Sequence, residues 1–493
     1  MTVPESSSRP ANSHDDEQVS TPQPGRVLAI LLLLGTAILT AVAGRLGGIL
    51  VGRGQLLAAV LTWAGCGITA ALLLARRPGR RDGALVLAVA AGLQVLALTS
   101  GPQLSDDLYR YVWDGRVAAA GIDPYAFPPD APELIRVRER FLWPDPADCQ
   151  RDRLSQPRDA RADPFANTFV PVGCTRINRS PVRTIYPPAA QLAFRGIEAI
   201  TGGRGGELQI QVPAALTSLA LTGLLVGLLR RARRPPGWAL LYAATPLAGL
   251  EAGMDGHVDV LAALLALGAL AVATQRRGGD LARGAAVGVL LAAAALVKIY
   301  PLALAAVALP RLGLRRPAAA LAVGAGLLAG ALAYAPHVRA VGVMVVGYLP
   351  GYLRENDYGS GERFLLLRHV VPLSLGAPVA ALLLAAIVTV AVVRTPREGD
   401  VAAIAAASAG VVGLAFLVLT PGNAWYGTLL IACAVVGGRP EWWGVVIANY
   451  VVYADAIFGT ATPWPSLCYL AAGLLAGGAA LGRRAARQPQ VAF

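Results

Sequence analysis

The side chains best suited to acid–base chemistry lie in the segment 105–116, which reads SDDLYRYVWDGR. Ser105 suits a helix N-cap, and a helix that begins there holds Asp106 and Asp107 in its first turn. Free N–H groups and the helix dipole favour ionised carboxylates at that place. An ionised carboxylate can take a proton from a hydroxyl as a general base. Helical spacing then predicts one polar and aromatic face, formed by Asp107, Arg110, Tyr111 and Asp114.

The aspartate pair also has a purely structural interpretation. Taken alone, Asp106 and Asp107 are more typical of helix capping combined with an ion pair to Arg110, since capping is the ordinary use of such residues. The segment begins where an apolar run ends at residues 99–102. We therefore expect its charges to lie where a membrane helix meets water.

A second unusual residue is Lys298, the only lysine in a chain that otherwise uses arginine. It lies in an apolar segment, where a cation is costly unless it is paired. A compact ammonium charge suits a phosphate group. A structural ion pair with Glu251 or Asp259 explains Lys298 equally well, and the sequence leaves both interpretations open.

Polar residues also gather around the GHVD motif at 256–259, with Glu251 shortly before it. His257 and Asp259 suit either a metal site or a turn that binds substrate. One histidine with scattered carboxylates is a poor set for a transition metal. We therefore predict hydrogen bonding to substrate and no resident metal, although a hard divalent cation such as Mg²⁺ is compatible with these residues. Trp425 suits either a substrate site or the aromatic belt of a membrane protein.

The composition indicates which class of protein positions these residues. The chain has 493 residues, of which 55% are hydrophobic and 15% charged, with a mean hydropathy of +0.54. These values predict an all-α polytopic membrane protein. The formal charge of +13 arises from short arginine clusters between apolar runs, which are typical of cytoplasmic loops. We therefore expect a lipid bilayer as a partner and no nucleic acid.

Apolar runs and basic clusters together predict the topology. We expect a disordered cytoplasmic tail at 1–25, a single membrane domain at 26–482 and a cytoplasmic C-terminal tail at 483–493, with both termini inside. The expected architecture is a bundle of about twelve full crossings plus one broken helical hairpin. The predicted crossings are 26–45, 55–76, 83–100, 207–229, 237–252, 257–274, 317–336, 371–393, 401–419, 424–437, 441–457 and 465–482.

The hairpin is predicted at 284–309, with a break near the KIYP motif at 298–301. A single crossing here would place the basic cluster at 311–316 outside and would invert every later basic loop. Two short helices that leave and return on the cytoplasmic side avoid this conflict. Such a break is tolerated where it is buried in protein or lines a cavity.

The longest polar region is the loop 101–206, which holds thirteen of the 30 acidic residues. We expect it on the extracytoplasmic side. Within it, residues 189–200 predict an amphipathic helix that lies on the membrane surface and carries Gln191, Arg195 and Glu198 on its polar face. Cys149 and Cys174 share this loop and suit either a disulfide in an oxidising compartment or two free thiols.

Five motifs resemble a known family in their order along the chain. They are SDDLYRY at 105–111, GIDPY at 121–125, TIYPP at 184–188, GHVD at 256–259 and KIYP at 298–301. The stretch from about 83 to 430 resembles the polytopic GT-C glycosyltransferases, with the closest likeness to the polyprenol-phosphate-mannose-dependent mannosyltransferases of actinobacterial envelope glycan synthesis. The resemblance implies a bacterial plasma-membrane enzyme whose active site faces away from the cytoplasm. Such an enzyme transfers a sugar from a polyprenyl phosphate to a glycan or lipoglycan acceptor, with inversion and without an obligatory cofactor.

The resemblance also implies roles for individual residues. Asp107 is expected to be the base, with the adjacent Asp106 as the alternative. The remaining predicted substrate-binding and phosphate-binding residues are Arg110, Tyr111, Tyr186, Glu251, His257, Asp259, Lys298, Tyr300, Arg363 and Trp425.

Other functions remain compatible with the sequence. A transporter or flippase of lipid-linked sugars is one alternative, although it should distribute polar residues through to the cytoplasmic side. A GT-C enzyme that uses arabinose or a protein acceptor is another. Retaining chemistry would need a second carboxylate as nucleophile, for which Asp114 or Glu251 would be the candidates.

Overall fold

A computed structural model describes residues 24–46, 53–76, 79, 81–144, 175–275, 279–313, 316–396, 400–459 and 462–486. Helices dominate these residues, and no strand occurs among them. The predicted tail up to residue 23, the end of the chain after residue 486, and both Cys149 and Cys174 lie outside them.

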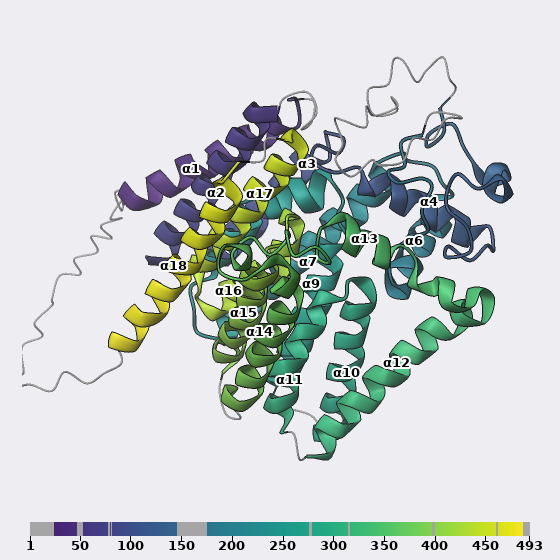
Figure 1. Cartoon of the computed structure of the whole chain (residues 1–493). Coiled ribbons are helices and arrows are strands. Elements are labelled where there is room, and N and C mark those ends of the chain that lie inside the picture. Colours follow the sequence, from purple (N-terminus) through teal and green to yellow (C-terminus); the bar gives the residue numbers. More distant parts are fainter. Residues whose placement is uncertain are drawn as a thin grey trace, which may run out of the picture.

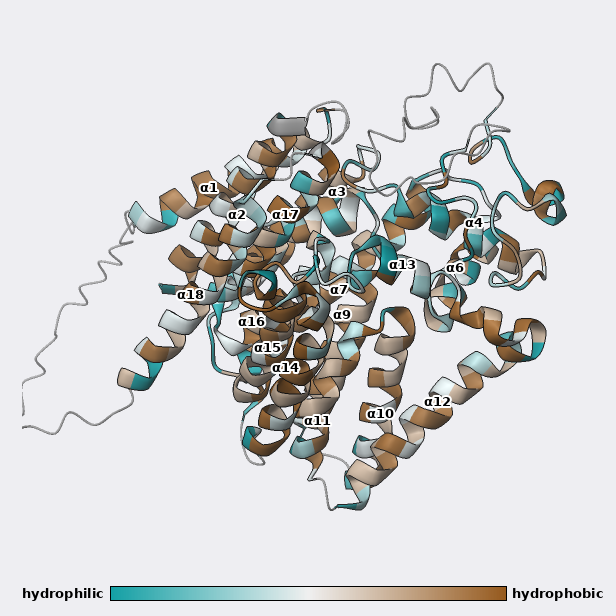
Figure 2. Cartoon of the chain, in the orientation of Figure 1, coloured by the Kyte–Doolittle hydropathy of each residue, from teal (hydrophilic) through white to brown (hydrophobic). Residues whose placement is uncertain are grey.

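Eight helices among the described residues are long and apolar enough to cross a membrane. Many of their leucines are exposed, and the ribbons of α1, α12 and α14 are largely brown, for hydrophobic residues, in Figure 2. The chain is therefore a polytopic membrane protein in character. The eight are α1 (Pro24–Ala43), α2 (Arg53–Arg76), α7 (Leu208–Arg231), α10 (Asp280–Val297), α12 (Pro317–Val341), α14 (Leu373–Arg394), α15 (Val401–Leu419) and α18 (Trp464–Ala485).

Several predicted crossings correspond to shorter or interrupted helices. The predicted crossing 237–252 is broken into a short 3₁₀ turn, the four-residue α8 (Leu240–Ala243) and the π-helix η3 (Leu247–Met254). The number of twelve crossings therefore stays a prediction. The other short apolar helices are α3 (Asp82–Ala97), α9 (Asp259–Ala273), α16 (Gly427–Gly437) and α17 (Trp443–Phe458).

The predicted break near Lys298 is confirmed. Helix α10 ends at Val297, and Lys298 has an extended backbone with φ −147° and ψ 137°. The chain then forms the 3₁₀ turn η4 (Tyr300–Leu304) and runs directly into α11 (Ala305–Leu312). In Figure 1, α9, α10 and α11 lie together in the bundle. The backbone break holds the Lys298 side chain outside a regular helix.

Small residues allow α10 and α12 to approach closely. A Cβ added at Gly284 would collide with the backbone carbonyl of Ala318, and one at Gly288 with that of Ala322. Such close backbone contact is the usual means of packing helices in lipid, where burial of apolar area gives little driving force. Toward its C-terminal end α12 diverges from α10 (Figure 1), and there His337 pairs with Asp123 of the polar loop at 2.7 Å.

The close packing of α10 on α12 predicts a marked difference between two glycine substitutions. Gly288→Ala should destabilise the fold by about 1–3 kcal/mol because the new methyl group must displace backbone atoms of α12. Gly324→Ala is the matched control, since it lies on α12 with nothing within 4 Å of its added Cβ. Thermal unfolding in detergent should show a lower midpoint for Gly288→Ala only. Equal midpoints would mean that the α10–α12 contact does not contribute to stability.

The polar loop builds its own small core from α4 (Asp107–Ala119) and α6 (Pro188–Thr201). The predicted amphipathic helix is confirmed as α6, and its place on the membrane surface stays a prediction. Gln191 and Glu198 are buried against the protein, whereas Leu192 and Ile200 are exposed. The reason is that Asp114 and Arg116 on α4 need polar partners, and α6 supplies them.

Candidate active site

The aspartate pair lies at the start of α4, where the Asn178 amide and the Tyr186 hydroxyl donate to it. The helix begins at Asp107, one residue later than expected, and Asp106 takes the N-cap position. The hydroxyl oxygen of Ser105 accepts the backbone N–H of Asp107 at 3.2 Å. The amide of Asn178 donates to both carboxylates, at 2.7 Å to Asp106 Oδ1 and 2.9 Å to Asp107 Oδ1.

The second carboxylate oxygen of Asp107 accepts a hydrogen bond from the Tyr186 hydroxyl at 3.0 Å. Burial raises the pKa of Asp107, but His257, Lys298 and the Asn178 hydrogen bond outweigh burial and bring the pKa below its ordinary value of 3.8. Hydrogen bonds and positive charges stabilise the ionised form in this way. Asp107 is therefore a carboxylate at neutral pH.

Aromatic rings hold Tyr186 in place. Tyr111 packs edge-on against Tyr186 at 4.9 Å between ring centroids and stacks on Phe194 of α6 at 4.6 Å. The hydroxyl of Tyr125 donates to the backbone carbonyl of Tyr186 at 2.7 Å. These contacts give Tyr111 a supporting position directly behind the hydroxyl that binds Asp107.

Arg110 and Asp114 form a buried ion pair at 3.0 Å. Asp114 also accepts hydrogen bonds from Thr184 at 2.5 Å and from Gln191 at 2.9 Å, and Arg110 donates to the backbone carbonyl of Val182 at 3.0 Å. The network therefore ties α4 and α6 to the segment that carries Tyr186. These contacts favour a positioning role for Arg110 over the predicted phosphate contact.

Lys298 makes the structural contact that the sequence offered as an alternative, and Asp259 is its partner. The ammonium nitrogen lies 3.3 Å from Asp259 Oδ2. It also lies 5.3 Å and 5.1 Å from the ring centroids of Tyr186 and Tyr426. Lys298 retains 15% side-chain exposure, whereas Asp259 is buried. The ammonium is thus shared between an ion pair and a partly open aromatic site that also contains the hydroxyl bound to Asp107.

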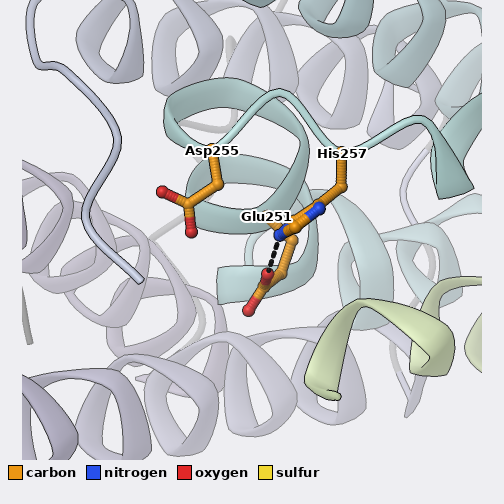
Figure 3. Close-up of side chains that lie close together, drawn as sticks. All are labelled: Glu251, Asp255 and His257. Atoms are coloured by element: carbon orange, nitrogen blue, oxygen red, sulfur yellow. Dashed lines mark ion pairs between the residues drawn. The ribbon is translucent and has the colours of Figure 1, made fainter. Parts of the chain in front are cut away.

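His257 and Trp425 form a stacked pair, with 3.9 Å between ring centroids and 19° between planes. The turn that carries Trp425 also carries Tyr426, whose hydroxyl lies 3.1 Å from that of Tyr352. His257 lies 3.4 Å from Glu251 (Figure 3). Trp425 is therefore part of the protein interior and not a belt residue at a lipid surface.

The remaining predicted residues lie at the edge of this arrangement. Tyr300 is half-buried beside Asp259, at the start of the turn that follows Lys298. Arg363 lies against Gly422 and Tyr358, and its backbone carbonyl accepts the hydroxyl of Thr420 at 2.5 Å. These contacts link Arg363 to the turn before Trp425 and not to the aspartate pair.

Two residues of the site were not predicted from the sequence. Asn178 bridges the two aspartates. Arg179 adds positive charge near both and pairs with Glu355 at 3.1 Å. Both lie in an irregular part of the long loop, and Arg179 has a positive φ of 45°. No motif or periodicity marks such positions, so only their spatial proximity to Asp107 identifies them.

No family model and no curated protein matches this chain.

Proposed function

We propose that the protein is an inverting glycosyltransferase that moves mannose from polyprenyl-phosphate-mannose to a hydroxyl of a glycan or lipoglycan. The observation that carries the proposal is the ionised, half-buried Asp107, held by the Asn178 amide and the Tyr186 hydroxyl close to the charge of Lys298. A fixed carboxylate near one cation suits the removal of a proton from an acceptor as a phosphate leaves.

In the proposed reaction Asp107 takes the proton of the acceptor hydroxyl. The hydroxyl oxygen attacks the anomeric carbon, and the bond from that carbon to the phosphate oxygen breaks. The electron pair of that bond goes to the polyprenyl phosphate, whose added negative charge Lys298 offsets. One displacement inverts the configuration at the anomeric carbon.

The contacts of the other carboxylates support inversion. A retaining enzyme needs a second carboxylate free to act as nucleophile. Asp114 is engaged by Arg110, Thr184 and Gln191, and Glu251 faces the ring of His257. Asp114 is therefore not free to attack, and Glu251 is buried beside His257.

The membrane setting agrees with a lipid-linked donor. We propose that the aspartate site faces the extracytoplasmic side of a bacterial plasma membrane, with both termini inside. Nucleotide sugars are absent from that side, so a polyprenyl phosphate must carry the sugar. The outward leucines of the apolar helices then provide the surface along which such a lipid diffuses.

The deciding experiment is sugar transfer by the full-length protein in detergent. Synthetic polyprenyl-phosphate-mannose and a short α-mannoside are supplied, and the product is analysed for linkage and anomeric configuration. Formation of an inverted mannosyl linkage supports the proposal. If the protein consumes an arabinosyl donor instead, the proposed donor sugar is wrong but the proposed glycosyl transfer stands. If no donor is consumed, lipid-linked sugar transport becomes the first alternative.

The low pKa of Asp107 predicts the acid limb of the pH profile. A base is active when deprotonated, so activity should fall only as the pH drops through a pKa lying below 3.8. We therefore expect kcat/KM to stay flat from pH 7 down to about pH 5. A fall already complete at about pH 6 would contradict Asp107 as the base. Circular dichroism at each pH is the control for unfolding.

A further inference from the structure

A buried cluster of possible metal ligands lies beside the candidate active site, at the end of the π-helix η3. Glu251, Asp255 and His257 are each at most 1% exposed. Each offers one ligand atom, and these atoms all lie within 4.8 Å of one another. Figure 3 shows Glu251 and His257 directed toward each other, with Asp255 alongside. The sequence interpretation treated the carboxylates around His257 as scattered and did not consider Asp255, whereas the fold brings Glu251, Asp255 and His257 together.

The backbone explains how three residues so close in sequence come to face one point. Gly256 has a φ of +65°, which turns the chain back after the π-helix, and the His257 N–H donates to the Glu251 carbonyl at 2.9 Å. A Cβ at Gly256 would lie 3.0 Å from Ile210 and 3.2 Å from Leu108. The turn is therefore fixed by both conformation and packing, and π-helical turns are frequent at functional sites.

The cluster places two buried carboxyl groups beside one imidazole. Lys298 is engaged by Asp259, which leaves His257 as the basic side chain within 4.0 Å of Glu251 in the described part of the chain. Neither ring nitrogen of His257 makes a hydrogen bond in that part. The phenol of Tyr450 lies beside Glu251 and is able to donate to its carboxylate. Buried polar groups normally have partners, so the orphan ring nitrogens of His257 indicate an absent one.

Asp255 differs from Glu251 in having a fixed orientation. Its Oδ1 accepts the backbone N–H groups of Gln103 at 2.6 Å and of Leu104 at 3.2 Å. The ring of His257 is likewise fixed by stacking on Trp425. Support of this kind from outside the ligand set is usual around metal ligands. Donors that share one ion at about 2.1 Å lie roughly 3–4 Å apart, so a small contraction of the cluster would complete the site.

We propose that Glu251, Asp255 and His257 bind one divalent transition-metal ion. A mixed set of imidazole and carboxylate ligands suits zinc or manganese better than the all-oxygen cations magnesium and calcium. Three protein ligands leave positions open for water or for a phosphate oxygen. The ion supplies the partner that the buried ring nitrogens of His257 lack. Its binding is independent of the transfer reaction, so failure of either proposal leaves the other standing.

The test measures metal content and needs no activity. Full-length protein, purified in detergent with a tag free of histidine, is analysed by elemental mass spectrometry. It is then stripped with chelator and titrated separately with Zn²⁺ and Mn²⁺ under equilibrium dialysis. We expect one ion per chain. Glu251→Gln and His257→Gln should each weaken its binding by more than about tenfold.

The matched control is Glu198→Gln, because Glu198 is another buried carboxylate with a basic neighbour, Arg116. It should bind metal as the unmodified protein does. Gel filtration checks that each variant is folded. If Glu251→Gln or His257→Gln is not folded, Asp255→Asn is tested in its place. Absence of binding by the unmodified protein would overturn the proposal. Binding that survives in the folded ligand variants would overturn it as well.

Discussion

Replacement of Asp107 by asparagine is expected to lower kcat by about a thousandfold, at the centre of the range for loss of a positioned base. Asparagine has the same shape but cannot accept the acceptor's proton. The Asn178 amide and the Tyr186 hydroxyl now both donate to Asp107. The side-chain oxygen of asparagine can keep only one of these contacts, so some loss of stability accompanies the loss of rate.

Asp106→Asn is the matched control for this prediction. Asp106 shares the Asn178 amide with Asp107, but only Asp107 also receives the Tyr186 hydroxyl among the described residues. We therefore expect a decrease in kcat of less than about tenfold, since Asp106 serves to position Asn178 and does not transfer a proton. Initial rates at saturating donor and acceptor measure both variants. Equal losses would assign the role of base to the pair. A larger loss for Asp106→Asn would assign it to Asp106.

The sequence predicted the location of the candidate site better than its internal contacts. The motifs around Asp107, Tyr186 and Lys298 are far apart in the chain, yet these three side chains meet at the start of α4. Each had a local signal: a carboxylate at a predicted helix start, an aromatic residue before two prolines, and a cation in an apolar run. Such signals depend on neighbouring residues alone, so they are visible without the fold.

The sequence had no comparable local signal for which side chains pair with one another. The sequence predicted that Arg110 binds a phosphate. In the structure Arg110 instead pairs with Asp114 and donates to the backbone carbonyl of Val182. Lys298 had two possible partners in sequence, and the geometry selects Asp259 over Glu251. Asn178 had no signal because amides are common in polar loops. These outcomes depend on how α4, α6 and the hairpin pack, which is a property of the whole fold.

The same limit explains the metal-ligand cluster. Glu251 and Asp255 have the i, i+4 spacing of ligands on one helix face, but His257 comes two residues later and does not fit it. Their convergence requires a π-helix followed by a glycine with positive φ. Neither feature can be read from hydropathy or from helical periodicity. The number of membrane crossings is uncertain in sequence for a related reason, because interrupted helices such as 237–252 resemble continuous apolar runs.

Lys298→Met should have the second large effect, on both stability and rate. Removal of the ammonium leaves Asp259 buried without its ion-pair partner, and breaking such a pair costs about 3–5 kcal/mol. Loss of the charge that offsets the leaving phosphate should also lower kcat/KM for the donor by about 10²–10³-fold. Thermal unfolding and donor kinetics measure the two effects separately.

A double variant distinguishes phosphate binding from simple neutralisation of Asp259. Lys298→Met combined with Asp259→Asn removes both charges, and replacement of a whole buried pair is often close to neutral for stability. The unfolding midpoint should therefore recover toward that of the unmodified protein. The rate should not recover, because the double variant still lacks a cation for the phosphate. If rate and stability recover together, the function of Lys298 is limited to its ion pair, and the phosphate must be held by another group.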